Sequence, residues 1–96
     1  MKKAYVYIIG NKTLTTIYIG VTNNIVKRVY EHRIEKGSEF TTKYNIKRLL
    51  YLEEHNNIED AIKREKQLKN WHRPWKIDLI KDNNPKFEDL SHDWYE

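Results

Sequence analysis

The chain has 96 residues, with 18 Lys or Arg and 14 Asp or Glu, so its formal net charge is +4. The absence of cysteine excludes disulfides, cysteine-ligated zinc and a catalytic thiol. No apolar run approaches the roughly 18 residues of a membrane span, and no signal-peptide core is visible. We therefore expect a soluble, cytoplasmic protein with no membrane partner, built as a single domain over residues 1–96. The mildly basic charge permits a polyanionic partner but does not establish one.

The N-terminal residues predict a β-hairpin. Ala4–Ile9 and Thr16–Val21 are rich in β-branched and aromatic residues, and the turn residues 10–15 separate them. Side chains alternate between the two faces of a strand. The hairpin is therefore expected to have one aliphatic face and one face that carries tyrosines, among them Tyr7 and Tyr18.

A helix and a third strand are predicted next. Residues 22–24 (Thr-Asn-Asn) are of types that favour helix N-caps, so a helix is expected over Ile25–Lys36, with Gly37 ending it. The polar residues Ser38–Asn45 predict a loop. The apolar centre of Ile46–Glu54 predicts a strand.

The C-terminal half predicts two further helices. Asn57 is a suitable N-cap for a helix over Ile58–Trp71, and Pro74 favours the first turn of a short helix that ends near residue 82. The order β-β-α-β-α-α indicates an α+β domain. Its core is expected to span about residues 3–82, and the tail 83–96 is expected to pack back on it.

Glu65 stands out because of its place on the predicted second helix. With Ile58 at zero on a helical wheel, Glu65 falls near 340°, between Ala61 near 300° and Ile62 near 40°. This puts a carboxylate inside the apolar stripe, which is costly unless the group is paired or binds a metal. From the residues alone, two interpretations stay equally open: Glu65 binds a metal, or it pairs with a buried Arg or a tyrosine hydroxyl.

Arg28 and His32 are four residues apart and share one face of the first helix, at the margin of its apolar stripe. An Arg there is able to bind a phosphate through two guanidinium N–H groups. An Arg and a His at this spacing, taken by themselves, more commonly lie on a solvated face of a helix. The histidines His55, His72 and His92 show no metal-ligand spacing and are interpreted as structural or exposed.

Read in chain order, these signals resemble the GIY-YIG nuclease superfamily. The segments that carry the resemblance are Tyr5-Val6-Tyr7, Tyr18-Ile19-Gly20, Arg28-x-x-x-His32 and Glu65. Residues 61–69, with Trp71, Arg73 and the tail from residue 84 to 94, resemble the small stand-alone bacterial subgroup of UPF0213-like proteins. That subgroup is related to the N-terminal domain of the excinuclease C subunit. The resemblance spans nearly the whole chain.

The resemblance implies a three-stranded antiparallel sheet with flanking helices, and hydrolysis of a phosphodiester by water with one divalent metal, Mg²⁺ or Mn²⁺. It makes Glu65 the sole protein ligand of the metal. Tyr7 and Tyr18 would flank the scissile phosphate, one of them as general base. Arg28 would stabilise the phosphate, and His32 would assist proton transfer or positioning. Tyrosine has an ordinary pKa near 10 and needs nearby positive charge to act as a base at neutral pH, which Arg28 and the metal would supply.

The predicted function is a metal-dependent endonuclease acting on DNA, in repair or recombination, as a monomer or weak dimer. The alternative is a nucleic-acid-binding module of the same fold with little or no stand-alone cleavage. It is motivated by Val21, which follows the second motif where several family members carry Lys; Tyr5 also replaces the Gly of the first motif. A third possibility is an interaction protein that binds its partner through Trp71, Trp75 or Trp94. The simpler expectation is that these tryptophans fill a thin core.

Overall fold

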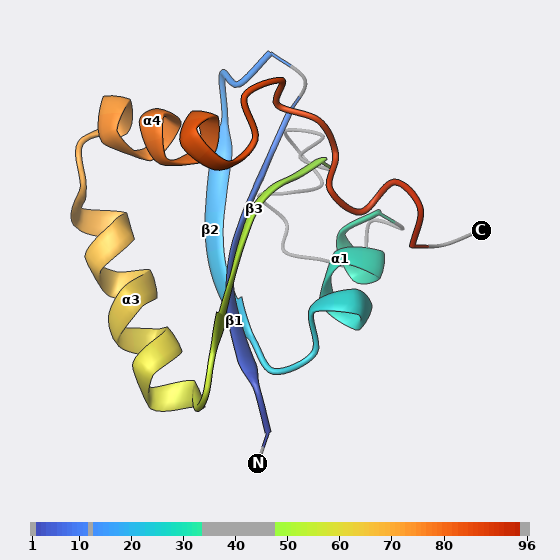
Figure 1. The fold of residues 1–96 in the computed structure, drawn as a ribbon, viewed down its shortest axis with the longest axis vertical. Coiled ribbons are helices and arrows are strands. Elements are labelled where there is room, and N and C mark those ends of the chain that lie inside the picture. The colour runs from blue at the N-terminus through green and yellow to red at the C-terminus, as the bar shows by residue number, and fades with distance from the viewer. Residues whose placement is uncertain (1, 12, 34–47, 95–96) are drawn as a thin grey trace.

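A computed structural model describes residues 2–11, 13–33 and 48–94. Its elements are β1 (Ala4–Gly10), β2 (Ile17–Thr22), α1 (Ile25–Arg33), β3 (Arg48–His55), α3 (Ile58–Asn70) and α4 (Arg73–Asn83). The strands form an antiparallel sheet of order β2-β1-β3. Helices α3 and α4 cover one face of this sheet and α1 covers the other (Figure 1). The predicted α+β class, three-stranded antiparallel sheet and element order are confirmed.

The predicted element ends differ from the observed ones by one or two residues. Trp71, predicted to be the last residue of its helix, is the C-cap of α3, with an extended backbone and its N–H donated to the Leu68 carbonyl at 3.2 Å. Helix α4 begins at Arg73, with Pro74 in its first turn as predicted. Three predictions lie outside the described residues: the end of the first helix at Gly37, the loop Ser38–Asn45, and the start of the third strand at residues 46 and 47.

The two faces of the sheet bury different kinds of side chain, as the alternation predicted. Toward α3 and α4 the buried side chains are Ala4, Val6, Ile8, Ile19, Leu50, Tyr51, Ala61, Leu68 and Ile80. Toward α1 they are Tyr7, Ile9, Ile25, Val29 and Leu49. Because Tyr7 lies in the second group, the tyrosine face of the hairpin is the face that α1 covers.

A β-bulge in β3 changes which side chains share a face. Ile8 pairs with Tyr51 and Ile9 with Leu49, so Leu50 has no partner on β1. An extra residue in one strand of an antiparallel pair bends that strand and interrupts the alternation. The consecutive residues Leu50 and Tyr51 therefore both face α3 and α4, which a strict period of two did not predict.

The residues after α4 pass over the end of the sheet to the side of α1 (Figure 1). There Leu90 donates its backbone N–H to the Leu49 carbonyl at 2.8 Å, and the Asp89 carboxylate accepts the Leu49 N–H at 3.2 Å. Trp94 packs against the cluster around Tyr7. The tail thus pairs with part of the outer edge of β3, while β2 forms the opposite edge of the sheet.

Trp75 does not belong to the core. It is 54% exposed at the corner between α3 and α4, where its ring meets those of Trp71 and His72 edge-on at centroid distances of 6.2 and 5.0 Å. The expectation that all three tryptophans fill the core is wrong for Trp75, whereas Trp71 and Trp94 pack against the two core clusters. Trp75 follows Pro74 in the first turn of α4 and points away from the buried Ile80 line of that helix.

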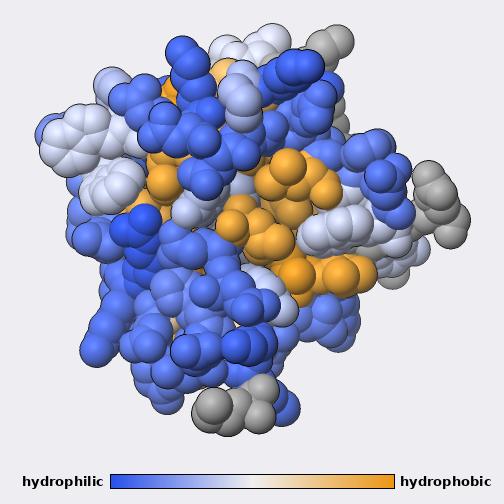
Figure 2. Space-filling view, in the orientation of Figure 1, coloured by the Kyte–Doolittle hydropathy of each residue, from blue (hydrophilic) through white to orange (hydrophobic). Residues whose placement is uncertain are grey.

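The surface in the view of Figure 1 is polar over α3 and α4, and hydrophobic side chains gather between β3 and α1 (Figure 2). The large exposed hydrophobic residues include Val26 and Tyr30 of α1 and Leu90 of the tail. Val26 of α1 is 50% exposed although it is apolar. No helix within the described residues has both the length and the apolar character that a membrane crossing requires.

Candidate active site

Gly20 allows Tyr7 to lie flat across the neighbouring strand. The two residues are register partners in β1 and β2. A Cβ atom at Gly20 would come within 2.4 Å of both Cζ and Oη of Tyr7. The backbone of Gly20 is not in the left-handed region, so glycine is required here for space and not for conformational freedom.

Three rings from three elements meet above Gly20. The centroid of Tyr7 lies 6.4 Å from that of Tyr18 and 5.9 Å from that of His32, and the last two are 5.9 Å apart. The Tyr7 hydroxyl is 3.3 Å from Nε2 of His32. Tyr7 and His32 are buried, whereas Tyr18 is only half-buried. Of the two predicted tyrosines, Tyr18 is therefore the one that reaches the surface.

The charges around the Tyr7 hydroxyl show that Arg28 and Glu65 also lie near it. Burial, with the neighbouring Tyr18 and Glu65, raises the pKa of Tyr7 to about 12, although the charge of Arg28 and a hydrogen bond from it act in the opposite direction. The sequence led us to expect that positive charge would make a tyrosine more acidic. For Tyr7 burial outweighs that effect, so this phenol stays protonated at neutral pH.

His32 is held in its neutral form. Burial, followed by the nearby charge of Arg28, lowers the pKa of His32 from its ordinary value of 6.5, and Glu31 only partly opposes this. A neutral imidazole has one ring nitrogen that accepts a hydrogen bond. With the proton on Nδ1, Nε2 accepts a hydrogen bond from the Tyr7 hydroxyl, which is consistent with the protonated state of that phenol.

We expect this histidine to make the protein less stable in mild acid. A group whose folded-state pKa lies below its unfolded value contributes stability above the unfolded value, here 6.5, and loses it as the pH falls toward the folded-state pKa. The melting temperature should therefore fall between about pH 7 and pH 5, and His32→Gln should flatten this part of the profile. The exposed His92→Gln variant is the control. An unchanged acid slope in His32→Gln would contradict the prediction.

Helix α3 presents Glu65 at the margin of its buried face. Ala61 and Leu68 are fully buried, whereas Ile58 and Ile62 are 40% and 37% exposed. The buried line of the helix therefore runs near 290° on the wheel, and Glu65 lies about 50° to one side of it. The apolar stripe is narrower than assumed, because Ile58 and Ile62 are exposed, so Glu65 lies at its margin and not at its centre. The Glu65 side chain is nevertheless only 15% exposed.

A polar cluster that the sequence analysis missed holds the other margin of α3 to the sheet. Nε of Arg64 donates to both carboxylate oxygens of Glu53, at 3.1 and 3.2 Å. Glu53 also accepts the Tyr51 hydroxyl at 2.6 Å and lies 2.6 Å from Nε2 of His55. Because Arg64 is tied to β3, the next residue, Glu65, is directed toward the opposite side, where β2 lies. The β3 residues of the cluster are spaced two apart and so share one face of the strand, and this spacing was the feature of the sequence from which the cluster could have been predicted.

The immediate partner of Glu65 is a lysine. Nζ of Lys69, one turn later, lies 3.3 Å from the carboxylate, and the Lys69 side chain is 50% exposed. Within the described part of the chain there is no group of three or more His, Cys, Asp or Glu residues able to hold a metal ion. A hard divalent cation does not need such a cage, because Mg²⁺ is commonly held by one or two carboxylates, water and substrate phosphate. The single, largely buried carboxylate of Glu65 fits that mode of binding.

Arg28 connects the ring cluster to a polar hollow at the start of α1. The side chain is 42% exposed, and its Nε lies 3.6 Å from Glu31. The Asn24 side chain caps α1 by accepting the Lys27 backbone N–H at 3.2 Å. The hollow has a volume of about 250 Å³ and is lined by Thr22, Asn23, Asn24, Lys27, Arg28 and Glu31. An arginine in this place has access both to the surface and to Tyr7.

The chain is similar to known proteins. The family described as the GIY-YIG catalytic domain matches residues 3–78. A UPF0213 protein of Syntrophus aciditrophicus is 41% identical over 86 residues, covering 86% of this chain and 95% of that protein. A UPF0213 protein of Staphylococcus haemolyticus is 32% identical over 82 residues, with coverage of 85% and 99%.

A solved structure is also similar. The solution NMR structure of a UPF0213 protein from Bacillus halodurans superimposes with a TM-score of 0.58 at 25% sequence identity. The match covers 95% of this chain and 97% of that one. The likeness therefore extends over most of the chain, and it is not confined to the tyrosine motifs.

Proposed function

Because this chain belongs to the GIY-YIG family, which is of nuclease type, we propose that it is a metal-dependent endonuclease that hydrolyses DNA phosphodiester bonds. One observation carries the proposal: side chains from β1, β2, α1 and α3 converge on the Tyr7 hydroxyl. The converging residues are Tyr7, Tyr18, Arg28, His32 and Glu65. A role in DNA repair or recombination in the cytoplasm is the setting we propose for it.

The scissile phosphate would bind between Tyr18 and Arg28. Both side chains lie beside the buried Tyr7 and reach the surface. The guanidinium of Arg28 would donate to the phosphate oxygens and stabilise the charge that develops there. A divalent metal held by Glu65, water and phosphate oxygens would offset the charge on the leaving oxygen.

The proton that the attacking water loses needs an acceptor near the phosphate. As water attacks phosphorus, the bond to the leaving oxygen breaks and that oxygen takes a proton from solvent. We assign the acceptor to Oη of Tyr18, which would take the proton in its deprotonated form, because this side chain reaches the surface beside the buried Tyr7. Tyr7, whose pKa of about 12 keeps it protonated, would instead hold His32 and the Tyr18 ring in position.

The test is a cleavage assay with nicked, branched and single-stranded DNA and Mg²⁺ or Mn²⁺. We expect cleavage of at least one substrate, and about a 100-fold loss of rate in Arg28→Ala, the size expected when a charge-stabilising donor is removed. Lys27→Ala, which removes an exposed cation from the same helical turn, is the matched control. If the wild-type protein cuts no substrate better than Glu65→Ala does, the enzyme proposal is wrong.

The second candidate is a nucleic-acid-binding module with little or no cleavage. The ion pair between Glu65 and Lys69 favours it, because it neutralises the carboxylate without a metal. Val21, in place of a lysine after the second motif, removes a cation from the site. Salt-dependent DNA binding that persists in Glu65→Ala and Arg28→Ala, without turnover in the wild-type protein, would support this reading.

A further inference from the structure

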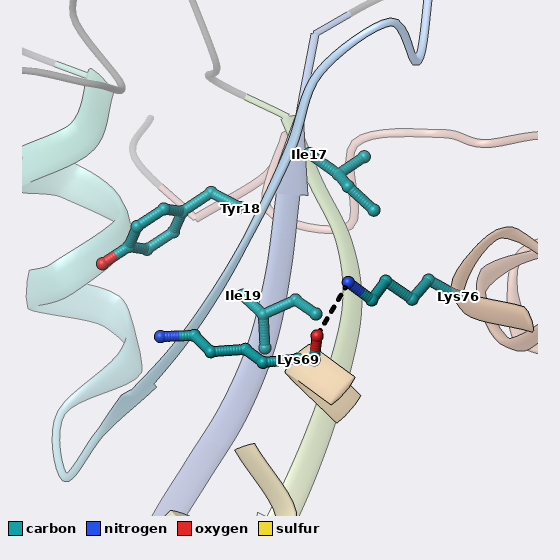
Figure 3. Close-up of a pocket in the computed structure, with 5 residues that line it drawn as sticks. All are labelled: Ile17, Tyr18, Ile19, Lys69 and Lys76. Carbon is teal, nitrogen blue, oxygen red and sulfur yellow. Dashed lines mark hydrogen bonds between the residues drawn. The ribbon is translucent and has the colours of Figure 1, made fainter. Parts of the chain in front are cut away.

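A second hollow lies beside the proposed active site, between β2 and the corner of α3 and α4. It has a volume of about 310 Å³ and is lined by Ile17, Tyr18, Ile19, Lys69 and Lys76 (Figure 3). We refer to it as the β2 groove. Only Tyr18 among these residues is used by the proposed chemistry.

Three consecutive residues of β2 join the groove to the active site. Ile17 and Ile19 project toward α3 and α4, and Tyr18 projects to the other face, toward α1 (Figure 3). This follows from the alternation of side chains along a strand. A ligand that touches Tyr18 at the active site is therefore one residue away from the apolar wall of the groove.

The opposite wall of the groove is cationic. Nζ of Lys76 donates to the backbone carbonyl of Lys69 at 3.3 Å, near the C-terminal end of α3 (Figure 3). Nζ of Lys69 extends the other way and pairs with Glu65. The ammonium of Lys76 is thereby held at the rim beside the isoleucines, and no acidic side chain lines the groove.

An apolar wall beside the ammonium group of Lys76 is complementary to a nucleotide, which combines an apolar base face with an anionic phosphate. The volume lies at the lower end of the range for ligand pockets, about 300–1,000 Å³, so one nucleotide is a suitable occupant. Within a duplex a base is stacked and paired, and taking it out has an energetic cost that is smallest for a base that is already single-stranded.

We propose that the β2 groove binds the unpaired nucleotide next to the scissile phosphate. The substrate would then be DNA with a single-stranded nucleotide beside the cut, as in a flap, a branch or a single strand, and not a continuous duplex. This inference rests on the proposed nuclease function, because it assumes that the DNA strand cut beside Tyr18 continues into the groove.

The experiment compares kcat/KM for a flapped DNA and for the same sequence as continuous duplex. The wild-type protein should prefer the flap, and Lys76→Glu should reduce this preference about tenfold, because one phosphate contact becomes repulsive. Ile17→Trp fills the groove without adding charge and should reduce the preference for the flap by a similar factor. Lys66→Glu, which makes the same charge change on the exposed side of α3, should leave the preference unchanged.

A binding measurement separates failure of the groove from failure of the nuclease proposal. In an NMR titration of Glu65→Ala with a short oligothymidine, amides of β2 next to the groove should shift, and Ile17→Trp should abolish the shifts. If the wild-type protein cuts DNA but both groove variants keep its substrate preference, the groove proposal is wrong and the nuclease stands. If it neither cuts nor binds any DNA, both proposals fail.

Discussion

Glu65→Gln is expected to lower the single-turnover rate of DNA cleavage by about 100- to 1,000-fold, comparable with the loss of other groups that stabilise transition-state charge. The variant keeps the shape of the side chain and removes its charge, so a hard divalent cation loses its protein ligand. The lost ion pair with Lys69, which is half exposed, should change the free energy of unfolding by less than about 1 kcal/mol. The measurements are cleavage rates over a range of Mn²⁺ concentrations and a urea unfolding curve.

Glu59→Gln is the matched control for this change. Glu59 lies in the first turn of the same helix and is exposed, so its loss removes an equal charge away from the tyrosines. We expect wild-type cleavage from this variant. Wild-type rates and an unchanged dependence on Mn²⁺ in Glu65→Gln would show that Glu65 neither binds the metal nor supports the reaction.

Gly20→Ala is expected to reduce both stability and cleavage. The new methyl group would come within 2.4 Å of Cζ and Oη of Tyr7. Tyr7 is fully buried and lies against His32 and Tyr18, so it has no free volume into which to move. Overpacking of this kind costs about 1–3 kcal/mol. Urea unfolding gives the loss of stability, and the cleavage assay gives the loss of rate.

Gly10→Ala serves as the comparison because its methyl group would meet mainly the Cδ1 atom of Leu50, at 2.8 Å. That atom is the end of a flexible side chain, so we expect a smaller loss of stability there. Adding Tyr7→Ala to Gly20→Ala should recover part of the packing cost, giving a double variant whose destabilisation is less than additive. Full additivity, or a Gly20→Ala protein as stable as the wild type, would contradict the steric argument.

The candidate site was predictable to the extent that it depends on local periodicity and motif. Alternation along β1 and β2 put Tyr7 and Tyr18 on one face, and the spacing of Arg28 and His32 put them on one side of a helix; the structure shows all four in one cluster. The place of Glu65 was less well predicted. The helical wheel does not show which side of α3 the sheet contacts, and the exposed Ile58 and Ile62 had suggested too wide a buried face.

The sequence by itself determined the fold class, the faces of the hairpin, the N-caps of α1 and α3 and the set of candidate site residues, because these follow from neighbours a few positions apart. Only the tertiary structure decided the rest. Burial under other elements raises the pKa of Tyr7 to about 12, whereas Tyr18 stays near the surface. The ion pair between Arg64 and Glu53 and the groove beside Lys76 each join separate segments of the chain, and local spacing does not show which of these segments will meet.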